Sequence, residues 1–204
     1  MSVTTVLWDA DGVLQHLPAG WEASMRPVVG HLVDDVDGFL AEAFEAERPA
    51  LAGRARWVEV LPVLLERWGL ADSYDDAMKA WLTIEPVVET QDLVRALRGR
   101  GIRCCLATNQ DEHRGRHMQA TFAYADLFDA TFYSYELGVA KPDPGYFTAI
   151  LDRLDAPADR VLFVDDNRAN VEAARTVGLH AEQWHVDDGQ PALRDHLARY
   201  GLPV

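Results

Sequence analysis

Hydrophobic residues recur along this chain with two different spacings, and each spacing predicts one kind of secondary structure. Short apolar runs rich in β-branched residues predict buried strands, whereas apolar positions three and four residues apart predict amphipathic helices. The expected strands are residues 3–8, 102–107, 130–134, 161–164 and 180–184. The expected helices around them are residues 87–98, 111–121, 145–154, 168–177 and 191–200. Strands that alternate with helices imply right-handed crossovers, so we expect an α/β fold with a Rossmann-like parallel sheet covered by helices on both faces.

The segment between the first strand and the rest of the sheet carries only the helical spacing. Between about residues 18 and 81, apolar side chains recur at three- and four-residue steps, as they do from Val36 to Phe44. We therefore expect residues 1–15 and 85–204 to form the Rossmann-like core. Residues 16–84 are expected to form an inserted α-helical cap.

Polar residues gather in four short motifs at or after the ends of predicted strands. These residues are Asp9, Asp11, Thr108, Asn109, Lys141, Asp165 and Asp166. In an open parallel sheet, ligands bind at the carboxyl ends of the strands. The four motifs should therefore meet at one edge of one sheet, where they would form a single site.

The charge of this expected site points to a metal ion. Four aspartates contribute −4 and Lys141 contributes +1, so the site carries a formal charge of −3. A cluster of this kind would repel a phosphate dianion. Oxygen ligands suit Mg²⁺, which would bridge carboxylate and phosphate and reduce the charge to −1. Mg²⁺ is therefore the expected cofactor.

With these motifs in this order, the chain resembles the haloacid dehalogenase-like superfamily in its phosphatase branch. The similar segments are Asp9-x-Asp11-Gly12-Val13, Thr108-Asn109, Lys141-Pro142-Asp143-Pro144 and Phe163-Val164-Asp165-Asp166-Asn167. The chain looks similar to bacterial phosphatases that act on glucose 1-phosphate. It is also similar to the amino-terminal phosphatase domain of mammalian soluble epoxide hydrolase.

The motifs and this resemblance imply a role for each residue. Asp9 would be the nucleophile that forms an aspartyl-phosphate, and Asp11 would be the general acid and then the general base. Thr108 and Asn109 would bind the phosphoryl oxygens. Lys141 would neutralise Asp9 and the transferring phosphoryl group.

The same reasoning assigns the metal ligands. Asp9, Asp166 and the backbone carbonyl of Asp11 would hold Mg²⁺. Asp165 would be a supporting acidic residue, and the choice between Asp165 and Asp166 as the direct ligand stays open. The function hypothesis is a Mg²⁺-dependent phosphatase that hydrolyses a small phosphomonoester, either a sugar phosphate or a nucleotide.

Three alternatives to this function remain. They are a phosphomutase, a metal-independent 2-haloacid dehalogenase and a catalytically quiet binding module. Asp11 speaks against the dehalogenase, because dehalogenases in this superfamily lack the second aspartate of the first motif.

Composition narrows the expected partners and location. The chain has 204 residues and a formal net charge of −14, which argues against binding to nucleic acid or to an anionic membrane. The expected partner is a small-molecule phosphomonoester, and both a monomer and a homodimer remain open. The sequence shows no signal-peptide pattern and no membrane-spanning run, so we expect a cytoplasmic protein. Cys104 and Cys105 should be small buried residues on opposite faces of a strand, without a disulfide.

Other residues have weaker signals. His113 and His117 share one helix face, which we expect to be solvated rather than metal-binding. We expect a solvated acidic surface on the helical cap at Asp34, Asp35, Asp37, Glu42, Glu45 and Glu47. Side chains suited to a sugar or a base occur in the cap at His16, Trp21, Arg56 and Trp57.

Overall fold

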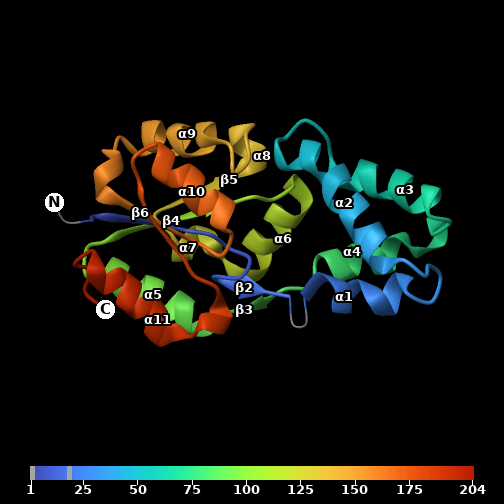
Figure 1. Cartoon of the computed structure of the whole chain (residues 1–204), viewed down its shortest axis with the longest axis horizontal. Coiled ribbons are helices and arrows are strands. Elements are labelled where there is room, and N and C mark those ends of the chain that lie inside the picture. The colour runs from blue at the N-terminus through green and yellow to red at the C-terminus, as the bar shows by residue number, and fades with distance from the viewer. Residues whose placement is uncertain (1–2, 18–19) are drawn as a thin grey trace.

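The protein is described by a computed structural model that covers residues 3–17 and 20–204. Its centre is a five-stranded parallel sheet with the order β5-β4-β1-β6-β7 (Figure 1). The strands are β1 (Thr5–Trp8), β4 (Arg103–Thr108), β5 (Ala130–Tyr133), β6 (Val161–Asp165) and β7 (His180–Gln183). The α/β fold class expected from the sequence is therefore confirmed, with each strand within two residues of its expected bounds.

Helices cover both faces of this sheet, as a buried parallel sheet requires. One face packs against α5 (Val88–Gly99), α6 (Glu112–Phe122), α7 (Tyr124–Leu127) and α11 (Gln190–Arg199). The other face packs against α9 (Pro144–Leu154) and α10 (Arg168–Thr176), and the short helix α8 (Ser134–Leu137) follows β5. Cys104 and Cys105 are buried free thiols in the cores on opposite faces, so both expectations for the cysteines are confirmed.

Four helices form a separate lobe beside the sheet, on the right in Figure 1. They are α1 (Gly20–Val29), α2 (Val36–Leu51), α3 (Trp57–Arg67) and α4 (Tyr74–Trp81), with a 3₁₀ turn at Ala71–Ser73. Their apolar faces form a hydrophobic core that is distinct from the two cores of the sheet. Among the described residues, no helix combines the length and apolar character needed to cross a membrane.

The chain crosses between the lobes twice, and a short antiparallel ribbon joins the two crossings. This ribbon pairs β2 (Gln15–His16) with β3 (Glu85–Pro86). Each strand has two residues, which is too short for a period-two pattern, so the sequence did not predict the ribbon.

Polar residues at the carboxyl ends of the strands also begin the helices that follow. Asp111 accepts hydrogen bonds from the His113 and Arg114 amides in the first turn of α6, and Asn167 accepts one from the Ala169 amide in the first turn of α10. Each cap satisfies amide groups that have no partner within the helix. The segments after β4 and β6 are thereby held where their side chains face the same sheet edge.

Two expectations for the helical lobe are wrong. Glu47 is not part of a solvated acidic surface, because its side chain is buried with only 8% relative exposure. Trp57 does not offer an open aromatic face, because it is buried in the helical core and packs on Trp81 with ring centroids 4.7 Å apart. The side chain of Trp21 lies outside the described residues.

Candidate active site

The ends of β1, β4 and β6 bring one buried ammonium between two carboxylates. Lys141 Nζ lies 2.8 Å from an Asp9 oxygen and 2.6 Å from an Asp165 oxygen. The same nitrogen donates to the backbone carbonyl of Ala107 at 3.0 Å. All three ammonium hydrogens therefore have acceptors, which fixes the Lys141 side chain against the sheet edge.

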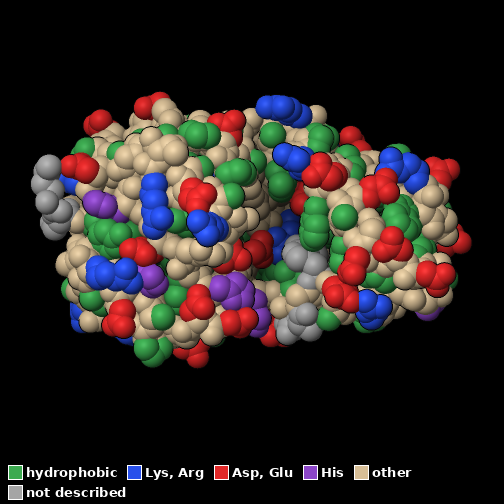
Figure 2. Space-filling model, in the orientation of Figure 1, with side chains coloured by type: hydrophobic (Ala, Val, Ile, Leu, Met, Phe, Trp, Pro, Cys, Tyr) green, Lys and Arg blue, Asp and Glu red, His purple; other side chains and the backbone are tan. Residues whose placement is uncertain are grey.

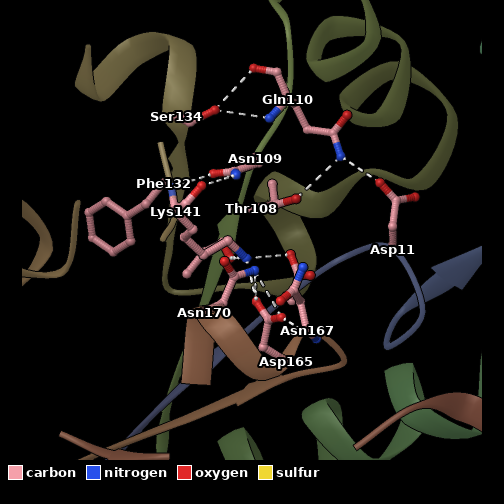
Figure 3. Close-up of polar contacts among 12 residues, drawn as sticks. Asp11, Thr108, Asn109, Gln110, Phe132, Ser134, Lys141, Asp165, Asn167 and Asn170 are labelled. Atoms are coloured by element: carbon pink, nitrogen blue, oxygen red, sulfur yellow. Dashed lines mark hydrogen bonds and ion pairs between the residues drawn. The ribbon is translucent and has the colours of Figure 1, made fainter. Parts of the chain in front are cut away.

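The Asp165 carboxylate is held by several donors at once. Its oxygens accept hydrogen bonds from Lys141, from the backbone amide of Asn167 and from the side-chain amide of Asn170 (Figure 3). The neighbouring Asp166 carboxylate has no hydrogen-bond partner within the described part of the chain. Asp165 is therefore the better anchor for Lys141, and Asp166 is the freer oxygen ligand.

Three carboxylates of this site converge closely enough to share a cation. Asp9, Asp165 and Asp166 each offer an oxygen, and these oxygens lie within 4.8 Å of one another. Burial, followed by the nearby charge of Asp165, raises the pKa of Asp9 well above its usual value. The same two causes raise the pKa of Asp166 to about 6. A divalent cation would relieve this crowding, so the donor set fits Mg²⁺.

The loop after β1 approaches this group so closely that only glycine fits at position 12. Gly12 has a positive φ of 75°, a conformation that disfavours any side chain. A Cβ added there would lie 2.6 Å from an Asp166 oxygen and 2.9 Å from the His185 ring. Gly12 thus allows the loops after β1 and β6 to meet.

The Asp11 carboxylate lies in a second polar cluster. Arg114 binds it with two hydrogen bonds, of 2.6 Å and 2.9 Å, one to each oxygen. Gln15 donates to one Asp11 oxygen at 2.9 Å, and Gln110 donates to the other at 2.8 Å. Burial raises the pKa of Asp11, but the Arg114 charge and these hydrogen bonds outweigh burial, so the net pKa is lowered.

The phosphate-binding candidates lie between the two clusters. Figure 3 shows the Gln110 amide between Thr108 and Asp11, and this amide donates to the Thr108 hydroxyl at 3.2 Å. The Asn109 side chain exchanges two hydrogen bonds with the backbone of Lys141, of 2.8 Å and 2.9 Å. Asn109 therefore positions Lys141, and its expected contact with phosphate stays a prediction.

One carboxyl group of the helical lobe reaches these clusters. Glu47 on α2 is surrounded by the charges of Asp111, Arg114 and Asp11, and burial raises its pKa to about 8. Arg114 Nε also donates to the backbone carbonyl of Trp81, at the end of α4, at 3.2 Å. The space-filling view shows the surface hollowed between the two lobes (Figure 2).

The remaining candidates lie apart from this constellation. His113 is exposed, His117 is half-buried, and neither belongs to the described group of possible metal ligands. Arg56 is exposed and lies 3.7 Å from Glu112 across the boundary between the lobes. His16 lies in the β2–β3 ribbon.

Sequence reasoning found the Lys141 cluster but missed Gln15, Gln110 and Arg114. None of these residues belongs to a motif, and each lies next to Asp11 only in the folded chain. A weak signal was present for Arg114, because it lies one helical turn before Met118 on the buried face of α6. A buried arginine on such a face needs an anionic partner.

Comparisons with known proteins agree with this geometry. A family model for haloacid dehalogenase-like hydrolases matches residues 3–178. A phosphatase of Mycobacterium tuberculosis is 28% identical, with 98% of this chain and 94% of that protein covered. A sesquiterpene phosphatase of Aspergillus oryzae is 35% identical over 99 residues, and this match covers 47% of the chain and 49% of that protein.

A solved structure has the same fold. It is a HAD family enzyme of Bacteroides thetaiotaomicron in complex with magnesium and inorganic phosphate, with a TM-score of 0.77 and 20% identity. The match covers 94% of this chain and 98% of the neighbour. Since the family model covers most of the chain and the four motifs meet at one sheet edge, this protein belongs to the haloacid dehalogenase-like hydrolase family.

Proposed function

We propose that this protein is a Mg²⁺-dependent phosphatase that hydrolyses a small phosphomonoester through an aspartyl-phosphate on Asp9. One observation carries the proposal: Asp9 belongs both to the Lys141 ion pair and to the group of three carboxylates. A nucleophile placed between a fixed cation and a cation site is suited to attack on an anionic phosphoryl group. The phosphatases among the relatives support the same chemistry.

Asp9 and Asp166 would hold the metal ion with their carboxylates, and Asp11 would add its backbone carbonyl, as the family resemblance implies. Asp165 would act by fixing Lys141, because its oxygens are already engaged. When bound, Mg²⁺ would offset the negative charge that accumulates between the carboxylates and the phosphoryl group.

The reaction divides into two displacements at phosphorus. In the first, an Asp9 oxygen forms a bond to phosphorus, the bond from phosphorus to the leaving oxygen breaks, and the protonated form of Asp11 gives its proton to that oxygen and becomes ionised. In the second, water attacks phosphorus, Asp11 takes a proton from the water, and the bond between phosphorus and Asp9 breaks. The Thr108 hydroxyl and the positive charge of Lys141 would stabilise the phosphoryl group in both steps.

The helical lobe is the part of the chain that can select the substrate. We assign residues 16–84 as its cap, because the motif residues act on the phosphoryl group common to all phosphomonoesters. The surface is hollowed between the lobes (Figure 2), and a small leaving group such as a sugar or a nucleoside would bind there. A cytoplasmic location suits such substrates.

A phosphate-release assay tests the proposal. The panel should contain an aryl phosphate, sugar phosphates, nucleotides and a sesquiterpenyl phosphate, because a sesquiterpene phosphatase is among the relatives. We expect Mg²⁺-dependent release from the aryl phosphate and from one class of natural ester. Halide release from a 2-haloacid, or transfer of phosphate between sugar positions, would favour the two alternative enzymes. No turnover of any of these compounds would favour a binding module.

A further inference from the structure

The guanidinium of Arg114 binds Asp11, the residue to which the proposed reaction assigns proton transfer. Its two terminal nitrogens hold the two oxygens of Asp11, at 2.6 Å and 2.9 Å. The side chain of Arg114 is 3% exposed, whereas that of Asp11 is 33% exposed. The Asp11 side chain is therefore accessible from outside, whereas Arg114 is screened from solvent.

The contacts around Arg114 leave it little freedom. One terminal nitrogen also donates to the side-chain oxygen of Gln110 at 2.7 Å, and Nε donates to the Trp81 carbonyl at 3.2 Å. Bidentate pairing of a guanidinium with a carboxylate fixes the orientation of the carboxylate as well as its position. Gln15 completes the arrangement, since it is held by the Tyr124 hydroxyl at 2.9 Å and donates to Asp11.

The Trp81 carbonyl gives this arrangement a second consequence. It lies at the end of α4, shortly before the chain returns through β3 to the sheet. The same guanidinium therefore binds the sheet lobe through Asp11 and the helical lobe through the Trp81 backbone. A shift of the helical lobe at this point would pull on the group that orients Asp11.

We propose that Arg114 is a positioning residue for the phosphatase reaction: it fixes the Asp11 carboxylate for proton transfer and ties that position to the end of α4. This inference rests on the proposed function, because it assigns Arg114 an effect only through the role of Asp11 as acid and base. The effect should be strongest in the second displacement, in which water must lose a proton.

The test compares Arg114→Lys with Arg114→Met and uses Arg116→Met as the matched control. Arg116 lies on the same helix, but its side chain is 74% exposed and pairs with Glu112. With an activated aryl phosphate, the first displacement needs little help from an acid, so a rapid-quench experiment separates the two steps. In both Arg114 variants we expect the initial burst of aryl alcohol to persist. The later steady rate should fall about 10- to 100-fold, with KM falling in parallel so that kcat/KM changes little, and with phosphorylated enzyme accumulating.

A double-mutant cycle separates positioning from a merely structural role. In an Asp11→Asn background, Arg114→Lys should lower the steady rate by less than about twofold, because the residue through which Arg114 acts is already lost. Two results would overturn this inference and leave the proposed function standing. One is an equal fall in steady rate when Arg114→Lys is made in the wild-type and in the Asp11→Asn background. The other is an Arg114→Lys variant whose steady rate equals that of Arg116→Met. A wild-type protein that releases no phosphate would overturn the proposed function and this inference with it. If Arg114→Met fails to fold, Arg114→Lys still gives the decision, because it keeps the buried positive charge.

Discussion

Asp9 and Asp11 are two residues apart in the sequence, yet they lie in two different polar clusters. Asp9 faces Lys141 and shares its surroundings with Asp165 and Asp166, and its pKa is raised by burial and by these carboxylates. Asp11 faces Arg114, and its pKa is lowered because the guanidinium and the hydrogen bonds to its oxygens outweigh burial. The Lys141 cluster carries more negative than positive charge, whereas the charges of Asp11 and Arg114 cancel.

This difference shows how one short motif can support two chemical roles. A carboxylate among other carboxylates is suited to bind a cation and, with the cation present, to attack phosphorus. A carboxylate that is fixed by an arginine but still one-third exposed is suited to exchange protons with a substrate or with water. The lowered pKa keeps Asp11 ionised and so favours its role as the base that takes a proton from water, whereas the raised pKa of Asp9 reflects the crowding of carboxylates at the expected cation site.

Neutralising each aspartate in turn should have the largest effect and should separate the two proposed roles. Asp9→Asn should lower kcat by about 10⁴-fold or more, with no phosphorylated enzyme, because the nucleophile is lost. Asp11→Asn should lower kcat by about 10²- to 10⁴-fold and should accumulate the phosphoenzyme with an activated substrate. Mass spectrometry of quenched enzyme makes the distinction. Covalent phosphate on Asp9→Asn at the wild-type level would refute the assignment.

Removal of Mg²⁺ should lower activity, because the Lys141 cluster would then keep its excess negative charge. After dialysis against EDTA we expect activity to fall by about 100-fold or more, since metal ions typically supply several kcal/mol of charge stabilisation. Added Mg²⁺ should restore activity and raise the melting temperature, because it binds the folded state. Neither gain should survive in Asp166→Asn. Full activity in EDTA would favour the metal-independent alternative.

Loss of the buried ammonium should destabilise the sheet edge. Lys141→Met leaves the Asp9 and Asp165 carboxylates without their shared partner, which should lower the free energy of unfolding by about 3–5 kcal/mol. The only other lysine, Lys79, is exposed on α4 and gives the control Lys79→Met. Denaturant unfolding of both variants without Mg²⁺ measures the difference. Equal stability of the two variants would show that the ion pairs contribute nothing measurable.

The smallest effect concerns Glu47, the carboxyl group that the helical lobe brings to the Asp11 cluster. Its pKa rises from 4.5 to about 8 on folding, so the folded protein keeps Glu47 protonated while the unfolded chain ionises. The contribution of Glu47 to the free energy of unfolding is largest at low pH and is lost as the pH rises from 4.5 towards about 8. Between about pH 5 and about pH 7.5 the loss is about 3 kcal/mol.

Glu47→Gln removes this titration, because the amide is neutral at every pH. Relative to the wild type, the variant should therefore gain in melting temperature as the pH rises. The exposed Glu45 lies on the same helix, so Glu45→Gln should follow the wild-type curve. Parallel curves for wild type and Glu47→Gln would contradict the raised pKa.

Local sequence patterns were enough to predict the sheet, the helices that cover it and the residues around Lys141. Hydrophobic spacing is a local property, and it marked each sheet strand because buried strands need apolar runs. The motifs followed those strands, so the geometry of a parallel sheet was enough to bring Asp9, Lys141 and Asp165 to one edge. No tertiary information was needed for this step, because the carboxyl ends of neighbouring parallel strands always lie together.

The surroundings of Asp11 and the burial of Glu47 depend on tertiary contacts that no local pattern predicts. Asp11 and Arg114 are separated by 103 positions, and nothing in the spacing of either residue marks the other. Glu47 lies on α2 among acidic residues that are mostly exposed, so its local sequence predicted a solvated carboxylate. Burial and pKa depend on which groups from distant segments surround a side chain, and the docking of the helical lobe on the sheet lobe fixes that.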